Sequence, residues 1–491
     1  MLFNSIDFII FFPIVVVLFF YTPQRFRWVL LLIASYYFYM SWEPAYAILI
    51  ITSTVIDYLA SHKIQLSKSQ RNRNLWLILS LLTNFGLLFS FKYYNFFSDS
   101  IAWISLYFPT PLSLPKANWL LPVGISFYTF QTVSYTIEVY RGKQKAEDHF
   151  GYFALYVSFF PQLVAGPIER PSNLLPQFRQ ESCFDYERVT NAFKLMAWGM
   201  FKKVVVADRL AMFVDPVYND PGSFSGPILC LATFFFAIQI YCDFSGYSDI
   251  AIGAAGVLGI KLMQNFNSPY LATSVVDFWR RWHISLSTWF RDYLYIPLGG
   301  NKVSLKRLQI NILIVFLVSG LWHGANWTFV MWGAIHGLFF VIHNISKPMR
   351  LFFVNFLQLN RLPRTLKGFQ IITTFLIVCF AWIFFRANSI SDAFYIINNL
   401  DSGWSSILDR VVISDMVYAI LGINSLRLIG ILGIIWMTII LLMIIIEFYE
   451  KPRQMFALWP WWTRWPSYFI LFFAMLFLGA YEQSAFIYFQ F

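Results

Sequence analysis

The sequence contains few charged residues and few cysteines. Asp, Glu, Lys and Arg account for 12% of its 491 residues, about half the share found in an ordinary soluble domain. The chain therefore lacks the charge needed to cover several water-facing domains. Its four cysteines show no metal or redox spacing, which excludes a disulfide scaffold and gives no reason to expect a bound metal ion. The 55 Phe and 19 Trp exclude a disordered chain. Most of its solvent must be lipid.

Apolar runs recur along the whole chain, in which 58% of the residues are hydrophobic. A helix that crosses about 30 Å of hydrocarbon needs roughly 20 mostly apolar residues. The runs do not show the roughly ten-residue alternation of a membrane β-barrel. We therefore predict an all-α, polytopic membrane protein with about 11 to 13 transmembrane or re-entrant helices. The candidate spans lie near residues 8–20, 28–39, 46–60, 75–91, 119–139, 152–167, 228–241, 308–322, 326–343, 371–385, 428–446 and 468–488.

The basic residues follow alternate spans. The formal charge of +11 is spread over loops, so we expect no nucleic-acid partner. Lys and Arg follow the first, third and fifth spans, which predicts cytoplasmic exits there and an extracytoplasmic N-terminus. The first span has no basic residue before it and is expected to be retained. The stretch 387–427 is expected outside because it contains Asp392, Asp401, Asp409 and Asp415.

The organisation predicts one membrane-embedded domain over residues 1–491. Residues 1–150 form N-terminal spans, residues 151–387 carry the polar motifs, and residues 388–491 contain an external loop and C-terminal spans. No internal repeat supports a transporter built from two similar halves.

Three of the six histidines lie in the stretch 308–346, which has no charged residue. Ionisable residues inside a membrane indicate function by default. His323 is flanked by small residues and by Trp322 and Trp327, which suggests an accessible imidazole between apolar walls. Catalysis or ligand binding is one interpretation, and a packed, hydrogen-bonded histidine is the other. For His336 and His343, seven residues apart on one helix face, packing or an interfacial position is favoured.

A tryptophan-rich segment over 277–293 is too charged to span a bilayer. Read as one amphipathic helix, it places His283 on the same face as Trp279 and Phe290 and pairs Asp277 with Arg281. Such a helix lies at the membrane interface or dips into a protein-lined cavity. His283 is either functional or a buried interfacial histidine.

A tight turn at Gly299 and Gly300 is predicted after this segment, followed by Lys302, Lys306 and Arg307. The turn and its cations have two interpretations. They hold the phosphates of a nucleotide-containing donor, or they form a plain positive-inside loop, which is the favoured reading.

Asp243 and Asp249 are the only charged residues between positions 227 and 261. Gly246, between them, suggests a helix break. The favoured role is structural, with each carboxylate accepting hydrogen bonds from the broken helix or pairing with an arginine. The candidate partners are Arg280, Arg281 and Arg291. The Gly/Pro-rich run at 161–170 is compatible with irregular backbone that lines a cavity.

Together these segments resemble the membrane-bound O-acyltransferase family, in its bacterial alginate O-acetylation branch. The matching stretches are PQLVAGPIER (161–170), DFSGYSDIAIG (243–253), DFWRRWHISLSTWFRDYLYIPLGGNK (277–302), LWHGANWTFVMWGAIHG (321–337) and AWIFFRA (381–387). The resemblance implies that His323 is the catalytic histidine and His283 the second signature position. It also implies a ring of helices around a thin central region that contains the catalytic cavity.

The resemblance further implies acyl transfer to a hydroxyl from a thioester donor, with acetyl-CoA expected and no bound cofactor. His323 is expected to act as general base, or to carry the acyl group covalently. The oxyanion donors stay open between His283, the Trp indole N–H groups and Asn326. Water exclusion is assigned to Trp279, Trp282, Trp322 and Trp327.

Bacterial members of the family hand the acyl group to an exported polymer through an extracytoplasmic serine-esterase-type partner. This sequence has no G-x-S-x-G elbow, so we expect such a partner together with an exported polysaccharide, most simply alginate-like, at the bacterial inner membrane. Peptidoglycan O-acyl transfer, D-alanyl transfer to teichoic acid and protein acylation are alternatives within the family. A glycan or lipid flippase without chemistry is the rival from another class.

Overall fold

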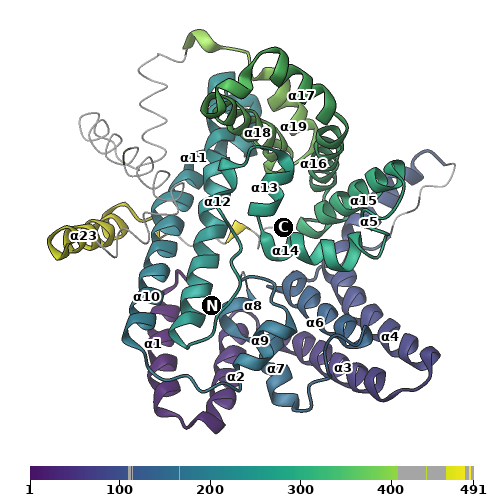
Figure 1. Ribbon diagram of the computed structural model, residues 1–491, viewed down its shortest axis with the longest axis vertical. Helices are drawn as coiled ribbons and strands as arrows, with labels where there is room; N and C mark the ends of the chain where they lie inside the picture. Colours follow the sequence, from purple (N-terminus) through teal and green to yellow (C-terminus); the bar gives the residue numbers. More distant parts are fainter. Residues whose placement is uncertain are drawn as a thin grey trace.

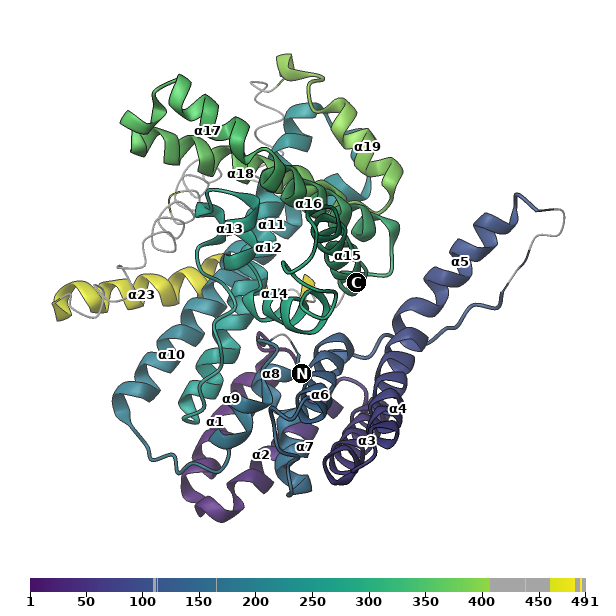
Figure 2. The ribbon, with the colours of Figure 1, turned by 45° about the vertical axis from the view of Figure 1, so that its right-hand side comes forward.

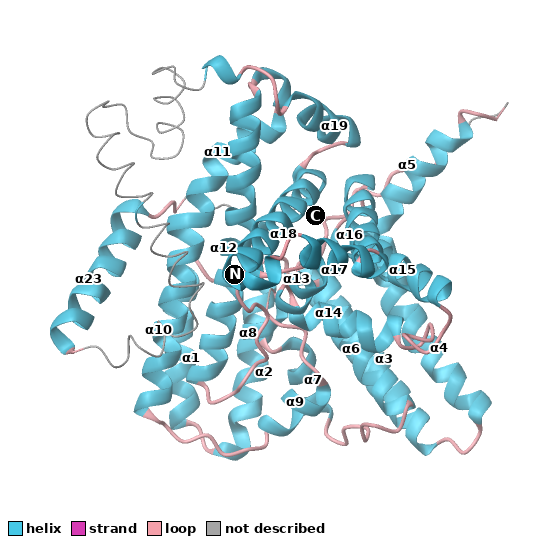
Figure 3. Cartoon of the chain, turned by 45° about the horizontal axis from the view of Figure 1, so that its top comes forward, coloured by secondary structure: helices cyan, strands magenta, loops and turns pink. Residues whose placement is uncertain are grey.

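The computed structural model describes residues 1–108, 112, 114–164, 166–406, 438, 460–481 and 486–487. Within these ranges all regular structure is helical and no strand occurs (Figure 3), which confirms the all-α prediction. By length and composition, six helical stretches in the described residues can cross a membrane. They are Pro44–Leu66, Gln70–Ser105, Gly226–Val257, Leu305–His323, Trp327–Ile345 and Pro363–Arg386. The total of 11 to 13 stays a prediction.

Several helices begin where the sequence offers a capping side chain. Ser5, Asp185, Ser274, Asn326 and Ser389 each accept a backbone N–H from the first turn of the following helix. Such caps satisfy one of the N–H groups that a helix start leaves without a partner. They explain why these helices start beside polar residues rather than within the apolar runs.

The N-terminal third forms antiparallel helices that match the first five candidate spans. The helices α4, η2 and α5 continue into one another and form an arm that leaves the body of the molecule (Figure 2). The elements are α1 (Ile6–Tyr21), α2 (Gln24–Met40), η1 (Pro44–Tyr46), α3 (Ala47–Leu66), α4 (Gln70–Leu88), η2 (Phe89–Tyr93), α5 (Tyr94–Ser105) and α6 (Ile125–Tyr140).

The middle of the chain departs from the predicted spans in two places. The span expected at 152–167 is two short helices separated at Phe159, and a long helical stretch over 186–219 was not predicted. The elements are α7 (Phe150–Ser158), α8 (Phe160–Leu163), α9 (Pro171–Gln177), α10 (Tyr186–Phe201), η3 (Lys202–Ala207), α11 (Asp208–Asn219), η4 (Pro221–Ser223), α12 (Gly226–Val257) and η5 (Pro269–Leu271).

The remaining helices in the described part of the chain follow residue 274. They are α13 (Val275–Arg281), α14 (Ile284–Phe290), η6 (Arg291–Tyr295), α15 (Leu305–His323), α16 (Trp327–Ile345), α17 (Lys347–Phe356), η7 (Leu359–Arg361), α18 (Pro363–Arg386), α19 (Ile390–Asn399), η8 (Trp404–Ser406) and α23 (Trp461–Leu478). The span expected at 428–446 lies outside the described residues except for Thr438, as do Asp409, Asp415 and part of the span expected at 468–488.

The short helices α13 and α14 lie near the centre of the molecule, with α12, α15, α16, α18 and α6 around them (Figure 1). The tryptophans Trp282, Trp332 and Trp382 are fully buried here. The long helix α12 packs on α10 and α11 on one side and on α18 on another. This arrangement surrounds the segment that carries His283 with helices, one of which, α15, ends at His323.

Candidate active site

Close helix packing sets the position of His323, the last residue of α15. A Cβ added to Gly320 would lie 2.3 Å from the carbonyl oxygen of Phe329, and one added to Gly333 would lie 2.3 Å from that of Phe316. The backbones of α15 and α16 therefore touch, as small residues allow in membrane helix pairs. The glycines near His323 therefore allow close helix packing. The sequence had suggested instead that they leave the imidazole accessible.

Aromatic rings enclose the His323 side chain, which is 2% exposed. Its ring centroid lies 5.0 Å from that of Trp322, 4.8 Å from Trp332 and 5.5 Å from Phe385. The predicted apolar surroundings are confirmed for Trp322. Trp327, by contrast, is 55% exposed, because it begins α16 on its outer face.

His283 is fully buried and breaks the segment that was predicted as one helix. Its φ of 44° is left-handed, so α13 ends at Arg281 and α14 starts at Ile284. The break is held by Asn265, whose carbonyl accepts the Ile284 N–H at 2.9 Å. The single helix over 277–293 is therefore wrong. The predicted ion pair between Asp277 and Arg281 is confirmed at 2.9 Å.

The side chain of Asn265 also fixes which nitrogen of His283 carries a proton. Asn265 Oδ1 lies 3.2 Å from the Ser285 N–H and 3.1 Å from His283 Nδ1. A backbone N–H can only donate, so the atom that faces it is the amide oxygen. His283 Nδ1 must therefore donate to the same oxygen, which leaves Nε2 with a lone pair.

The two histidines predicted to be functional are brought together. The ring centroids of His283 and His323 are 6.5 Å apart, and Trp322 lies against both. The residues come from α15 and from the break between α13 and α14, which are 40 positions apart in the chain.

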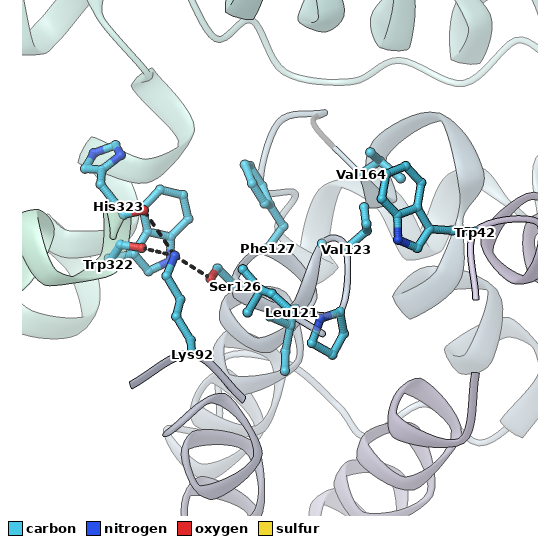
Figure 4. Close-up of a pocket in the computed structure, with 12 residues that line it drawn as sticks. Trp42, Lys92, Leu121, Val123, Ser126, Phe127, Val164, Trp322 and His323 are labelled. Carbon is cyan, nitrogen blue, oxygen red and sulfur yellow. Dashed lines mark hydrogen bonds between the residues drawn. The ribbon is translucent and has the colours of Figure 1, made fainter. Parts of the chain in front are cut away.

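A pocket of about 510 Å³, counting the open space at its mouth, reaches His323 (Figure 4). Lys92 of η2 projects between His323 and the first turn of α6, and Trp42 lies at the far side of the pocket. The full lining is Trp42, Lys92, Leu121, Pro122, Val123, Gly124, Ile125, Ser126, Phe127, Val164, Trp322 and His323.

The sequence reasoning missed several site residues, namely Lys92, Asn265, Trp332 and Phe385. A signal existed for Lys92, which is the only charged residue between positions 75 and 98. Trp332 and Phe385 lie inside the stretches 321–337 and 381–387 that resemble the family, but nothing in those stretches singled out their side chains. Asn265 lies outside them, and the place of all three beside the histidines depends on how distant elements pack.

The irregular run at 161–170 supports the site indirectly. Glu169 is buried and accepts the Met263 N–H at 2.5 Å and the Asn173 side-chain amide at 2.7 Å. Burial raises the pKa of the Glu169 carboxyl above its usual range. This contact holds the extended stretch that leads to Asn265, and Val164 of the same run lines the pocket.

The two aspartates of α12 do not mark a helix break. Helix α12 is continuous from Gly226 to Val257, and Gly246 serves close packing, since a Cβ there would lie 2.8 Å from the carbonyl oxygen of Gly199. The predicted arginine partners are also wrong. Lysines from η3 take that place, with Lys203 2.7 Å from Asp243 and Lys202 2.8 Å from Asp249.

The cations Lys302, Lys306 and Arg307 are exposed at the opposite end of α15 from His323, about 26 Å away along the helix. The predicted turn before them is confirmed by the positive φ angles of Gly299 and Gly300. The structure therefore places these cations apart from the two histidines.

Three further candidates have structural surroundings. His336 is fully buried and accepts the Trp279 indole N–H at 3.3 Å, which confirms packing. His343 lies near the end of α16, where Arg350 contacts it. Asn326 caps α16 through Thr328, and its amide nitrogen donates to the Asn388 carbonyl, so this side chain is engaged away from His323.

Comparison with known proteins identifies the family of the chain. Residues 144–390, which include both histidines, match the family model described as MBOAT, membrane-bound O-acyltransferase family. The chain is 39% identical to the "Probable alginate O-acetylase AlgI" of Pseudomonas aeruginosa over 80% of this chain and 73% of the relative.

Two other relatives carry different names. The peptidoglycan O-acetyltransferase of Helicobacter pylori is 37% identical over 75% of this chain and 73% of its own length. The teichoic acid D-alanyltransferase of Streptococcus thermophilus is 31% identical over 45% of this chain and 56% of its own length. On the extent of these matches, the chain belongs to the membrane-bound O-acyltransferase family and is an O-acyltransferase.

Proposed function

We propose that this chain moves an acetyl group from cytoplasmic acetyl-CoA across the membrane for O-acetylation of an exported, alginate-like polysaccharide. The main observation behind this proposal is that the buried imidazoles of His283 and His323 lie 6.5 Å apart, with His323 at the end of a pocket. The similarity to alginate O-acetylases over 80% of the chain supports the acetyl group and the acceptor class.

The pocket is proposed to receive the acceptor hydroxyl. Trp42 follows the second candidate span, and residues 121–124 lie at the start of the fifth, just before α6. Both places are on the predicted extracytoplasmic side. Helix α6 starts at this pocket and has only 16 residues, about 24 Å, which is shorter than the roughly 30 Å of a bilayer core. A thin site of this kind supports reaction between a donor and an acceptor on opposite sides.

His323 is proposed as the general base. It takes the proton of the acceptor hydroxyl as that oxygen attacks the thioester carbonyl carbon. The C–O bond forms, the C–S bond breaks, and the proton passes to the departing CoA thiolate, so no net proton is used. A positioned base of this kind contributes about 10²–10⁴ in rate. The surrounding rings exclude water, which would otherwise hydrolyse the thioester.

His283 is proposed to accept a hydrogen bond rather than to stabilise the oxyanion. Its Nδ1–H is directed at Asn265, and a neutral imidazole protonated at Nδ1 has an acceptor rather than a donor at Nε2. The oxyanion needs donors, and the buried indole N–H groups of Trp322 and Trp332 have no hydrogen-bond partner among the described residues. These two groups are the better candidates.

The donor's phosphates are proposed to contact Lys302, Lys306 and Arg307 on the predicted cytoplasmic side. Their distance from His323, about 26 Å along α15, requires an extended donor whose thioester lies far from its nucleotide. The pantetheine arm of CoA has this form. An extracytoplasmic serine-esterase-type partner would then present or relay the acetyl group on the outer side.

The test replaces His323 and His283 separately by Ala in bacterial cells that export an alginate-like polymer. We expect acetyl ester on the polymer to fall by about 100-fold or more for His323→Ala, at unchanged membrane levels. His343→Ala is the matched control, since its side chain contacts Arg350 at the end of α16, and should keep wild-type acetylation. Full acetylation in a well-expressed His323→Ala protein would reject the proposal.

Peptidoglycan acetylation is the second candidate, because the Helicobacter pylori relative is nearly as similar as the alginate O-acetylase. Purified protein in proteoliposomes, given radiolabelled acetyl-CoA and either alginate or peptidoglycan fragments, distinguishes the two by which polymer gains label. D-alanyl transfer has the weaker support of a match over 45% of the chain. A flippase would release no CoA.

A further inference from the structure

The last four carbonyl groups of α15 all accept hydrogen bonds, and three of them accept from side chains of another helix. A helix leaves its last four C=O groups without partners inside the helix, and α15 ends inside the protein at His323. Only one of the four is satisfied by the local turn. The donors are the Gly324 N–H to Gly320 at 3.3 Å, the Tyr93 hydroxyl to Leu321 at 2.8 Å, and Lys92 Nζ to Trp322 at 2.8 Å and to His323 at 3.1 Å.

Two consecutive residues, Lys92 and Tyr93, therefore hold three consecutive carbonyls. They lie about 230 positions earlier in the chain, in the π-helical segment η2, which directs both side chains at the same helix end. The ammonium also places a positive charge at the negative end of the α15 dipole. The contact joins the arm of Figure 2 to the residue that carries the chemistry.

Lys92 is not free to bind a substrate. Its ammonium has three N–H groups, and three acceptors face them: the two carbonyls and the Ser126 hydroxyl at 3.4 Å (Figure 4). Because His323 is the last helical residue, the direction of its imidazole depends on the turn that Lys92 and Tyr93 hold. A displacement of about 1 Å in a catalytic group can cost about 100-fold in rate.

We propose that Lys92 and Tyr93 are positioning residues that lock the last turn of α15 and so aim His323 at the reacting hydroxyl. The inference rests on the proposed function in that His323 is the base. The lock itself is a property of the fold and can be tested without turnover.

The test measures acetyl-CoA turnover by purified protein in proteoliposomes with alginate fragments. We expect Lys92→Met to lower kcat by about 100-fold and Tyr93→Phe by about tenfold, with KM for acetyl-CoA within about twofold. Lys92→Arg should recover most of the lost kcat, because a guanidinium can donate to the same carbonyls.

Matched controls lie on the arm or on the loop that follows it. Tyr94 donates its hydroxyl to Pro115, away from α15, and Lys116 pairs with Asp99 on the surface. Tyr94→Phe and Lys116→Met should therefore keep wild-type kcat.

A second measurement does not require activity. Diethylpyrocarbonate, which modifies accessible imidazoles, is applied to the purified protein and mapped by mass spectrometry. We expect Lys92→Met to raise the modification rate of His323 by about tenfold, while exposed His149 reacts at the wild-type rate. If His323 in Lys92→Met is labelled at the wild-type rate, the proposal that Lys92 holds the last turn of α15 is wrong, whatever rate of acetyl-CoA turnover is measured.

The outcomes separate the two proposals. A wild-type protein that turns over no acetyl-CoA even when its serine-esterase-type partner is added refutes the proposed function. The diethylpyrocarbonate labelling rate of His323 then decides whether Lys92 and Tyr93 hold the last turn of α15. Two results together would overturn the positioning role: Tyr93→Phe leaves kcat unchanged, and Lys92→Arg fails to restore kcat. They would show that Lys92 acts only on folding.

Discussion

Chemistry at the residue scale depends on which polar groups remain available once packing is complete. The Asn326 amide is used as a helix cap, and His283 donates through Nδ1 to Asn265. The indole N–H of Trp332 is buried without a hydrogen-bond partner among the described residues, and its ring lies 4.8 Å from His323. An unsatisfied buried donor is costly, and stabilising an oxyanion is a function that would repay this cost.

Trp332→Phe should therefore lower kcat by about 100-fold, which is the usual cost of losing one oxyanion donor. KM for acetyl-CoA should change little. The matched control is Trp382→Phe, which removes the same N–H and similar volume from a buried tryptophan whose ring contacts are with Trp332, Phe385 and other core rings. Equal losses of kcat in the two variants would assign the effect to packing and reject the oxyanion role.

The two histidines could be predicted from the sequence because polar residues inside an apolar run require a reason, and because their flanking motifs are distinctive. Trp332 and Asn265 could not. Asn265 lies in ordinary sequence, and the motif that contains Trp332 does not distinguish it from its neighbouring tryptophans. The role of each arises only when α16 or the extended stretch after α12 packs against a histidine. Sequence patterns report local environment, whereas these contacts join separate elements.

At the scale of elements, buried charge explains the largest error in the predicted spans. The stretch 186–219 has too many charged residues to resemble a span, yet α10, η3 and α11 form a long helical run. The charges at the centre of this run face inward: Lys203 lies 2.7 Å from both Asp208 and Asp243 and is 1% exposed. The apolar-run rule assumes that charge seeks water, and a helix that pairs its charges inside the protein escapes that rule.

Lys203→Met should destabilise the protein by about 3–5 kcal/mol, because it leaves two buried carboxylates without their shared cation. Unfolding in mixed detergent micelles, followed by circular dichroism, measures the loss. Lys116→Met is the control, since it removes an exposed ion pair with Asp99 that contributes less than about 1 kcal/mol. A loss for Lys203→Met no larger than for Lys116→Met would show that these charges are solvated in the native protein.

For the whole molecule, the proposed transfer requires that the pocket beside His323 and the cations before α15 face opposite sides of the membrane. The helix α15 connects them, with Lys306 near its start and His323 at its end. The distribution of basic residues predicts that the start is cytoplasmic. The same rule places the loop after α3 in the cytoplasm and the segment after α19 outside.

Reporter fusions test this orientation directly. Fusions of a cytoplasm-active and a periplasm-active reporter at Arg71, in the first turn of α4, and at Ser402, after α19, should report opposite sides, with Arg71 cytoplasmic. A third fusion at Lys302 should agree with Arg71, because both sites follow the positive-inside rule. If Arg71 and Ser402 report the same side, the predicted topology is wrong. If Lys302 reports the outside, the donor and acceptor would have to enter from reversed faces, and the proposed path from cytoplasmic acetyl-CoA to an exported polymer could not operate.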